Sequence, residues 1–406
     1  LNTTVVVAAL GYFVDVYDLL LFQIVRKKSL ISLGYTTDQL LDEKGSMLIT
    51  IQMAGLLLGG IFWGILGDKK GRLSVLFGSI FLYSAANLLN GFVTNIETYA
   101  ILRFIAGVGL AGELGAGITL VSEVMSKETR GYGTMIVASV GVLGAVTAAI
   151  IDQYFDWRIS YFIGGGLGLM LLLLRISVFE SGMFNKIKKS EVGRGNFFAL
   201  FSTYEKLSTY LKCIFVGLPV WYIIGILITF SSSFAVEMGL VKGSIVDGNS
   251  IMFCYIGLVF GDLISGSMSQ YFRSRKKVFL IFYIFSGAVV ASYFLMNSPS
   301  VVLFYSMCLL LGLSVGFWAI LVTVSAEQFG TNLRATVATT VPNFVRGSLI
   351  PVLLIFNFFK QHFFKGSANQ NIASAALVGV IVYIISFIAL YYIKETFGKD
   401  LDYMEE

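Results

Sequence analysis

The sequence predicts an all-α membrane protein in which twelve transmembrane helices form two pseudo-symmetric six-helix bundles. Its 406 residues are 56% apolar and only 13% charged, about half the charged content, ~25%, of an ordinary soluble domain. Apolar runs of roughly twenty residues recur along the chain, and each is long enough to cross ~30 Å of hydrocarbon as a helix. One long basic segment divides these runs into six and six. This composition excludes a soluble enzyme, a nucleic-acid-binding protein and a disordered chain.

The expected spans are continuously apolar and lack the residue-by-residue alternation of a membrane β-barrel, so they are predicted to be helices. They cover residues 3–25, 47–67, 73–93, 98–122, 132–151, 159–178, 213–234, 249–268, 278–296, 301–324, 336–358 and 372–393. The chain therefore divides into an N-terminal bundle, a cytoplasmic linker loop, a C-terminal bundle and a cytoplasmic tail, at residues 1–178, 179–212, 213–393 and 394–406.

Basic residues set the expected orientation. With both ends on one side of the membrane, that side carries eighteen Lys and Arg residues in its loops and tail, against eight on the opposite side. Basic residues favour the cytoplasmic face, so we expect a multi-pass protein of the bacterial inner membrane with both termini in the cytoplasm. One cluster does not fit this rule: Arg26, Lys27 and Lys28 follow the first span on the outer side.

The two halves of the sequence repeat each other. At an offset of 202 residues, the glycines of the second span match those of the eighth: Gly55, Gly59 and Gly64 with Gly257, Gly261 and Gly266. At an offset of 204, two charged pairs match: Glu123 and Arg130 with Glu327 and Arg334. Two bundles related in this way suit alternating access to a central site. Close helix packing accounts for the glycines alone, but not for the repeated Glu and Arg.

Two segments carry a family resemblance. The loop after the second span reads GILGDKKGR from Gly64 to Arg72, which resembles the G-x-L-x-D-x-x-G-R signature of the major facilitator superfamily. The fourth span begins RFIAGVGLAG from Arg103 to Gly112 and is similar to the superfamily's R-x-x-x-G-x-G-x-x-G. The resemblance implies a secondary transporter, not an enzyme. It needs no cofactor because a proton gradient supplies the energy, and spans 1, 4, 7 and 10 line its cavity.

The loop signature also implies a cytoplasmic latch, a charge cluster that holds the inner gate shut in one state and breaks in the other. The expected gating residues are Gly64, Asp68, Gly71, Arg72, Glu123, Arg130, Glu327 and Arg334. Their glycines would let spans 2 and 11 approach closely. The alternative is a set of basic membrane anchors with incidental acids.

Charged residues inside the spans are the candidates for proton coupling, because such residues are costly in a membrane. Asp15 and Asp18 share one face of the first span, and Arg103 of the fourth span lies at a similar depth. An acid that loses its arginine when helices move takes up a proton. We expect Asp18 to pair with Arg103 in one conformation and Asp15 to protonate more readily, with the reverse assignment open and Glu113 as the next candidate. The alternative is a static ion pair that orients the first span.

This span-1 pattern, D-x-x-D, resembles that of proton symporters for phosphate and for organic acids. Glu113 and the FES segment at 179–181 are more similar to bacterial metabolite:proton symporters of the proline/betaine and dicarboxylate group. The resemblance implies proton-coupled import of a small polar or charged organic solute by a functional monomer in the lipid bilayer. An exporter, a uniporter and a non-transporting sensor are the alternatives.

Substrate contacts are expected in the second half. Pro342 frees backbone groups in the middle of the eleventh span, and Arg346 beyond it would hold an anionic substrate group. Neutralisation of Arg346 by Asp262 is the equally weighted alternative. The other expected substrate-binding residues are Tyr17, Trp221, Tyr222, Trp318 and Asn343. For the aromatic residues among them, aromatic packing is the alternative.

The latch gives a first testable prediction. Asp68→Asn or Arg130→Ala should strongly slow transport without impairing membrane insertion, because these charges act between two conformations. Turnover by purified protein in proteoliposomes, normalised to the amount inserted, measures the effect. Full turnover of the double variant would contradict the latch.

Overall fold

The fold is all-helical throughout the described part of the chain. A computed structural model describes residues 3–70, 72–113, 130–180 and 197–398. In the first half the helices are α1 (Thr3–Ser32), α2 (Asp38–Lys70), α3 (Arg72–Asn90), α4 (Ile96–Leu110), α6 (Arg130–Tyr154) and α7 (Trp157–Glu180). In the second half they are η2 (Phe197–Phe201), α8 (Tyr204–Val216), α9 (Leu218–Tyr222), η3 (Ile223–Ile228), α10 (Ser231–Glu237), α11 (Asp247–Phe272), α12 (Arg275–Phe294), α13 (Val301–Ser314), α14 (Trp318–Glu327), α15 (Thr331–Gly347), α16 (Leu349–Phe358), η4 (Phe359–Phe363) and α17 (Gln370–Tyr392).

Within the described residues, each expected span is mainly helical; residues 114–122 of the fourth expected span lie outside them. Among the described residues, nine helical segments are long and apolar enough to cross a membrane, or ten when the bent pair of Tyr204–Val216 and Leu218–Ile228 counts as one span. The third expected span corresponds to α3, with its shorter apolar stretch Val75–Asn90, and the fourth begins with α4. Residues 181–196 of the expected linker at 179–212 lie outside the described residues. Its last part forms η2 and the first turns of α8, so the seventh helical segment begins at Tyr204 rather than at 213.

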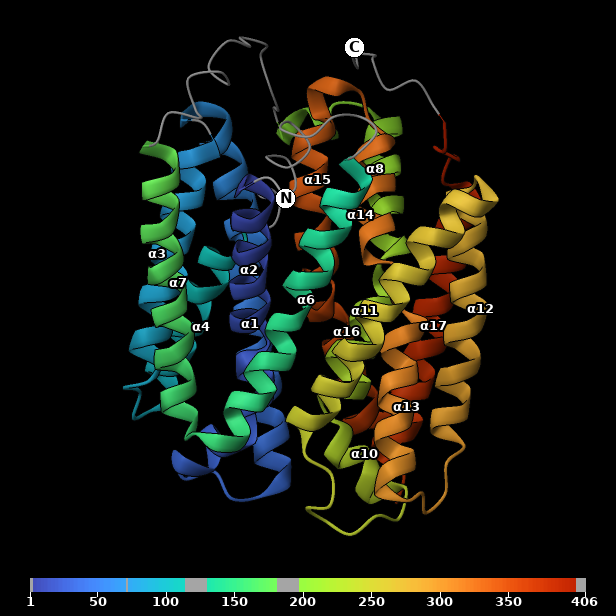
Figure 1. Cartoon of the computed structure of the whole chain (residues 1–406). Coiled ribbons are helices and arrows are strands. Elements are labelled where there is room, and N and C mark those ends of the chain that lie inside the picture. The colour runs from blue at the N-terminus through green and yellow to red at the C-terminus, as the bar shows by residue number, and fades with distance from the viewer. Residues whose placement is uncertain (1–2, 71, 114–129, 181–196, 399–406) are drawn as a thin grey trace.

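The helices form two groups that stand side by side (Figure 1). Helices from α1 to α7 make one group and helices from α8 to α17 make the other. The two groups meet where α6 packs against α11 and where α2 packs against α15 and α16. The beginning of α1 and the end of α17 lie toward one end of the molecule, and α10 lies at the other (Figure 1). We call the end that contains α10 the distal end.

Three spans of the second half are interrupted. The seventh segment passes through α8 and α9, then a π-helical turn, η3, and α10. The tenth breaks between α13 and α14, and the eleventh contains Pro342 and is interrupted at Ser348, between α15 and α16. In a membrane, non-helical backbone is tolerated only where protein or a cavity surrounds it. These breaks therefore indicate the place where a binding site is built.

Glycine contacts confirm the internal repeat at the level of packing. In the first half, Cβ atoms added to Gly55 and Gly59 would collide with the carbonyl oxygens of Phe104 and Val108 in α4. In the second half, 202 residues later, the same atoms on Gly257 and Gly261 would collide with the carbonyl oxygens of Leu309 and Leu313 in α13. The backbones of α2 and α4, and of α11 and α13, therefore touch directly, as small residues permit in membrane bundles.

The end near the termini contains a tightly held carboxylate outside the membrane-spanning segments. Glu395 accepts hydrogen bonds from the Ser274 hydroxyl and from the backbone N–H groups of Arg275 and Lys276 at the start of α12. Partial burial raises the pKa of Glu395, but these bonds and one from the Phe397 N–H lower it to about 2. The Glu395 carboxylate therefore stays ionised at the N-terminus of α12, where the helix dipole stabilises its negative charge.

The close packing of α11 on α13 can be tested with a matched pair of substitutions. Gly312→Leu should destabilise the protein by about 1–3 kcal/mol, the usual cost of overpacking, because a Cβ atom there overlaps the Cys254 carbonyl. Gly287→Leu in α12 is the control, since nothing lies within 4 Å of the position of its Cβ. Thermal unfolding of the detergent-purified protein is the measurement. Equal melting temperatures for the two variants would refute the packing argument.

Candidate functional site

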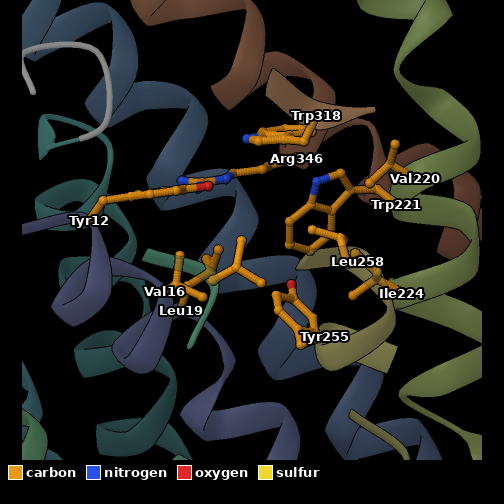
Figure 2. A pocket seen from close by; sticks show the side chains of 11 residues that line it. Tyr12, Val16, Leu19, Val220, Trp221, Ile224, Tyr255, Leu258, Trp318 and Arg346 are labelled. Atoms are coloured by element: carbon orange, nitrogen blue, oxygen red, sulfur yellow. The ribbon is translucent and has the colours of Figure 1, made fainter. Parts of the chain in front are cut away.

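A pocket lies between the two halves, in the region where the helices are interrupted (Figure 2). Its cavity volume is about 20 Å³, close to the ~10–15 Å³ that one water molecule needs, so the pocket is nearly closed in this conformation and must widen to admit an organic solute. Its lining comes from helices of both halves and consists of Tyr12, Val16, Leu19, Val142, Val220, Trp221, Ile224, Tyr255, Leu258, Trp318 and Arg346. The pocket is therefore small, mainly apolar and aromatic, with a single charged side chain in its wall.

That charged side chain joins the two halves. Arg346 of α15 donates through Nη1 and Nη2 to the same oxygen of Asp15 in α1, at 3.4 Å in each case. Both side chains are buried. Two of their polar atoms, Asp15 Oδ1 and Arg346 Nε, have no hydrogen-bond partner among the described residues. The pair is thus long and incompletely bonded, with capacity left for a further polar group.

Aromatic rings surround this ion pair. The guanidinium carbon of Arg346 lies 5.8 Å from the centre of the Trp318 ring, within cation–π range. Figure 2 shows the Tyr12 hydroxyl directed toward the guanidinium and the Trp318 ring alongside it. The indole N–H of Trp318 is buried and unpartnered within the described structure. The site therefore offers a cation, flat apolar faces and a free N–H donor.

The predicted pairing in the first half is different in the structure. Arg103 donates to Asn87 Oδ1 at 2.7 Å and lies 5.0 Å from the Tyr161 ring centre. No ion pair within 4 Å connects it to Asp15 or Asp18, all three of which are described. Asp18 is fully buried, and neither of its oxygens has a hydrogen-bond partner in the described structure. In this conformation, therefore, the expected Asp18–Arg103 pair is absent: Asp15 is paired, with Arg346, and Asp18 is the carboxyl group without an ion-pair partner among the described residues.

Glu113 has a partner that the sequence did not indicate. It forms a two-pronged ion pair with Arg175 of α7, which includes a 3.0 Å bond from Nη1 to Oε2. A Cβ atom on Gly11 would collide with both side chains, so α1 packs directly against the pair. A carboxylate bound on both oxygens is well stabilised. Both oxygens of Glu113 are thus occupied by Arg175, whereas neither oxygen of Asp18 has a hydrogen-bond partner among the described residues.

Three of the expected substrate-binding residues line the pocket, and three lie elsewhere. Trp221, Trp318 and Arg346 are in the pocket wall. The others are directed away from it and have partners of their own. Tyr17 donates to the Ser160 carbonyl, Tyr222 to the Ala375 carbonyl and Asn343 to the Ala111 carbonyl. Asn343 thereby connects the second half to the end of α4.

The expected Asp262–Arg346 pair is absent as well. Asp262 accepts a hydrogen bond from the backbone N–H of Ala319 at 3.2 Å, while Arg346 bonds to Asp15. The alternative expectation, in which Asp262 neutralises Arg346, was therefore wrong. The break in the tenth span brings the N-terminus of α14 to Asp262 instead.

Sequence reasoning missed two lining tyrosines, Tyr12 and Tyr255. Helical spacing carried a signal for both: Tyr12 lies three residues before Asp15, and Tyr255 lies seven residues before Asp262. Residues at such spacings share a helix face. A search along the faces that contain buried acids would have found them.

The predicted latch lies mostly outside the described part of the structure. Gly71 and Glu123 are not described, nor are the side chains of Asp68, Arg72 and Arg130. Gly64 is described, and a Cβ atom there would meet nothing within 4 Å, so it does not provide the expected close approach. In the second half, Glu327 pairs with Arg275 at 3.4 Å and accepts a hydrogen bond from Thr396. Arg334 lies in the first turns of α15.

The distal end contains a charged cluster that no motif predicted. Arg26 is fully buried and bonds to Asp42 Oδ1 at 3.3 Å, Asp247 Oδ2 at 3.1 Å and the Thr229 carbonyl at 3.1 Å. Its guanidinium also lies 4.2 Å from the centre of the Phe230 ring. Arg26 and Asp42 belong to the first half, and the other three residues belong to the second. We call Arg26, Asp42 and Asp247 the distal cluster.

Further hydrogen bonds cross between the halves around this cluster. They connect Lys27 with Ser232, Asp42 with Ser233, Gln23 with Thr229, and Gln153 with Asn249. Lys28 instead bonds to Asp152 within the first half, at 2.9 Å. The basic residues that violated the orientation rule therefore have a structural explanation: they bind partner groups at the distal end.

Comparison with known proteins agrees with this architecture. The family model "Major Facilitator Superfamily" matches residues 9–350. A Bacillus subtilis (strain 168) protein named for niacin/nicotinamide transport is 25% identical, over 88% of each chain. A Haemophilus influenzae metabolite transport protein is 26% identical over 97% of this chain and 96% of its own. The sialic acid transporter of Escherichia coli (strain K12) is 32% identical over 43% of each chain.

Solved structures share the fold. A D-xylose–proton symporter aligns with a TM-score of 0.71 and 13% identity, over 98% of this chain and 99% of its own. A xylose symporter bound to a bromodeoxyglucose aligns with a TM-score of 0.74 and 14% identity, over 98% and 97%. Identities this low show the fold alone. Together with the family match over most of its length, they establish that the chain is a multi-pass membrane transporter that belongs to the Major Facilitator Superfamily.

Proposed function

We propose that this transporter imports a small organic anion with a proton, through the pocket between its halves. The observation that carries the proposal is the Asp15–Arg346 pair, because it places a titratable acid and an anion-binding group together where the two halves meet. Ionisable groups within a membrane mark substrate and proton pathways.

The lining of the pocket favours an anion with a flat ring. Arg346 supplies a planar guanidinium suited to a carboxylate, and four aromatic side chains supply stacking faces. No Ser, Thr, Asn or Gln is among the lining residues of the described pocket, so a sugar would bind with most of its hydroxyls unsatisfied. The relatives named for niacin and for sialic acid support a small organic solute.

The ion pair also provides a route to coupling. When a substrate anion binds Arg346, it competes with Asp15 for the same donors. An unpaired carboxylate is costly in an apolar interior, so Asp15 released from Arg346 takes up a proton. Asp18, one turn away on the same face of α1, is a second place for that proton, since neither of its oxygens is hydrogen-bonded in the described structure. One monoanion then crosses with one proton and without net charge.

The distal cluster supports an assignment of the two ends. The excess of basic residues on the side of the termini favours that side as cytoplasmic, which makes the distal end the outer one. Any conformation that opens the pocket outward must break the bonds of Arg26 to Asp247 and to the Thr229 carbonyl. We infer that the distal cluster is part of the outer gate.

Uptake by proteoliposomes tests the coupling. With radiolabelled niacin as the probe, an inward proton gradient should drive accumulation, and a membrane potential set by potassium and valinomycin should not, because the cycle moves no net charge. Asp15→Asn should abolish accumulation and retain exchange at equal pH.

Arg346→Lys keeps the charge but loses the planar fork, and should weaken binding about tenfold, ~1.4 kcal/mol.

Asp18→Asn separates the two acids. If only Asp15 carries the proton, Asp18→Asn still concentrates substrate; if the proton passes through both, it does not. Accumulation by both single variants in response to pH would refute proton symport at this site and leave a uniporter, an exporter or coupling at Glu113.

The outer gate is tested by accessibility from outside the cell. A Cys reporter replaces Val16 in the pocket wall, and a membrane-impermeant thiol reagent is added to intact cells. Arg26→Met should raise the labelling rate, since loss of ~1–3 kcal/mol of contacts between the halves shifts the equilibrium by about 5–150-fold. Lys28→Met is the matched control, because it removes a charge at the same end whose ion pair lies within one half. Equal labelling of both variants would exclude Arg26 from the gate.

A further inference from the structure

The break in the tenth span rests directly on α11. Helix α13 ends at Ser314 and α14 begins at Trp318. Between them, Gly316 lies so close to Gly261 that a Cβ atom on either glycine would collide with the backbone of the other. The start of α14 is therefore placed against one fixed point of α11, one residue before Asp262.

Asp262 bonds to this helix start. Its Oδ1 accepts from the Ala319 N–H at 3.2 Å. It is 5% exposed, and it forms no ion pair within 4 Å with any described residue. A buried carboxylate without a cation is unusual in a membrane. Here the free N–H groups and the positive dipole end of α14 stabilise it.

The bonded helix start is also part of the pocket wall. Trp318 is the first residue of α14, and its ring covers the Arg346 guanidinium. Leu258, one turn before Asp262 on α11, lines the same pocket. The Asp262–Ala319 bond therefore connects two elements of the wall, and it determines where the indole sits relative to the cation.

We propose that Asp262 is a positioning residue that sets substrate selectivity by holding Trp318 over the anion-binding end of the pocket; this rests on the proposed function, in which the substrate anion binds Arg346. The role requires an acceptor atom rather than a charge. Asn caps helix N-termini about as well as Asp, whereas Ala does not. Asp262→Asn should therefore behave like the native protein, and Asp262→Ala should not.

Binding to the purified protein provides the first test. The probes are niacin and cyclohexanecarboxylate, which has the same charge and a similar size but no flat ring. Native protein and Asp262→Asn should prefer niacin to the same extent, within twofold. Asp262→Ala should lose most of that preference, and in uptake by proteoliposomes its KM for niacin should rise with little change in kcat. Ser265→Ala is the control, because it removes a buried hydrogen bond to the Asp262 backbone carbonyl and leaves the Asp262 side chain, which bonds to α14, in place.

A double-mutant cycle decides whether the effect passes through Trp318. Residues that act through one another give non-additive effects. Trp318→Leu should lower the preference for niacin as much as Asp262→Ala does, and the double variant should be no worse than Trp318→Leu alone. Additive losses would overturn the proposal. So would an Asp262→Asn variant that loses proton-driven uptake, since Asp262 would then act as a proton carrier.

A measurement without substrate separates this inference from the proposed function. The chain has four tryptophans, so replacing Trp63, Trp157 and Trp221 by Phe leaves Trp318 as the only emitter. In this background Asp262→Ala should shift the emission to the red and increase quenching by acrylamide, whereas Asp262→Asn should do neither. An unchanged spectrum in Asp262→Ala would overturn the positioning role, whatever the transported solute is. Failure of niacin to bind the native protein would count against the proposed substrate alone.

Discussion

The cost of burying charge in an apolar bundle organises this structure. Four arginines are fully buried among the described residues, and each is placed by the groups that satisfy it: Arg26, Arg103, Arg175 and Arg346. Arg175 and Arg103 find their partners inside the first half, in a carboxylate and an amide. The other two find theirs across the interface between the halves. Charges satisfied within one half stiffen it, whereas charges satisfied across the interface must exchange partners whenever the halves move.

The two interface arginines differ in how completely they are bound. Arg26 has two carboxylates, a carbonyl and an aromatic ring around it, and it lies at the distal end, away from the pocket. Arg346 has one carboxylate oxygen at 3.4 Å, and it lies in the pocket wall. The Nε atom is unpartnered in both arginines, so the difference lies in the number and length of the other bonds. A group with more partners favours a single conformation, and one with fewer favours binding of a further group. In the proposed function, an arginine therefore closes the outer gate at the distal end, and another arginine binds the substrate anion in the pocket.

Repeated close packing supplies the rigid frame for these exchanges. Glycines at matching positions press α2 onto α4 and α11 onto α13 through backbone contacts. Because side chains are absent at these contacts, each helix pair has little freedom to slide. Movement is thereby directed to the interface between the halves and to the breaks, such as the one before Trp318. The repeat thus matters for function through stiffness as well as through symmetry.

The sequence alone determined the fold class, the positions of the spans, the repeat and the family, because hydrophobic length and glycine spacing are local properties of the chain. It also identified Arg346, Trp221 and Trp318, since a charge or a large aromatic residue inside a span is visible without knowing its neighbours. The 1–178 and 213–393 bundle limits and the cytoplasmic latch stay predictions, because residues 114–129 and 181–196 are not described.

Only the tertiary structure decided which charges pair. Asp15 and Asp18 are equivalent in the sequence, one turn apart on one helix, yet one meets Arg346 from the other half and the other meets no cation within 4 Å in the described chain. As residues that line the pocket, Tyr17 and Tyr222 were as plausible as Tyr12 and Tyr255 until the rotation of each helix about its axis was known. Partners separated by 331 residues, as Asp15 and Arg346 are, meet only through the docking of two bundles. Helix periodicity specifies which face a residue shares, but the contacts of that face depend on how all the other helices pack.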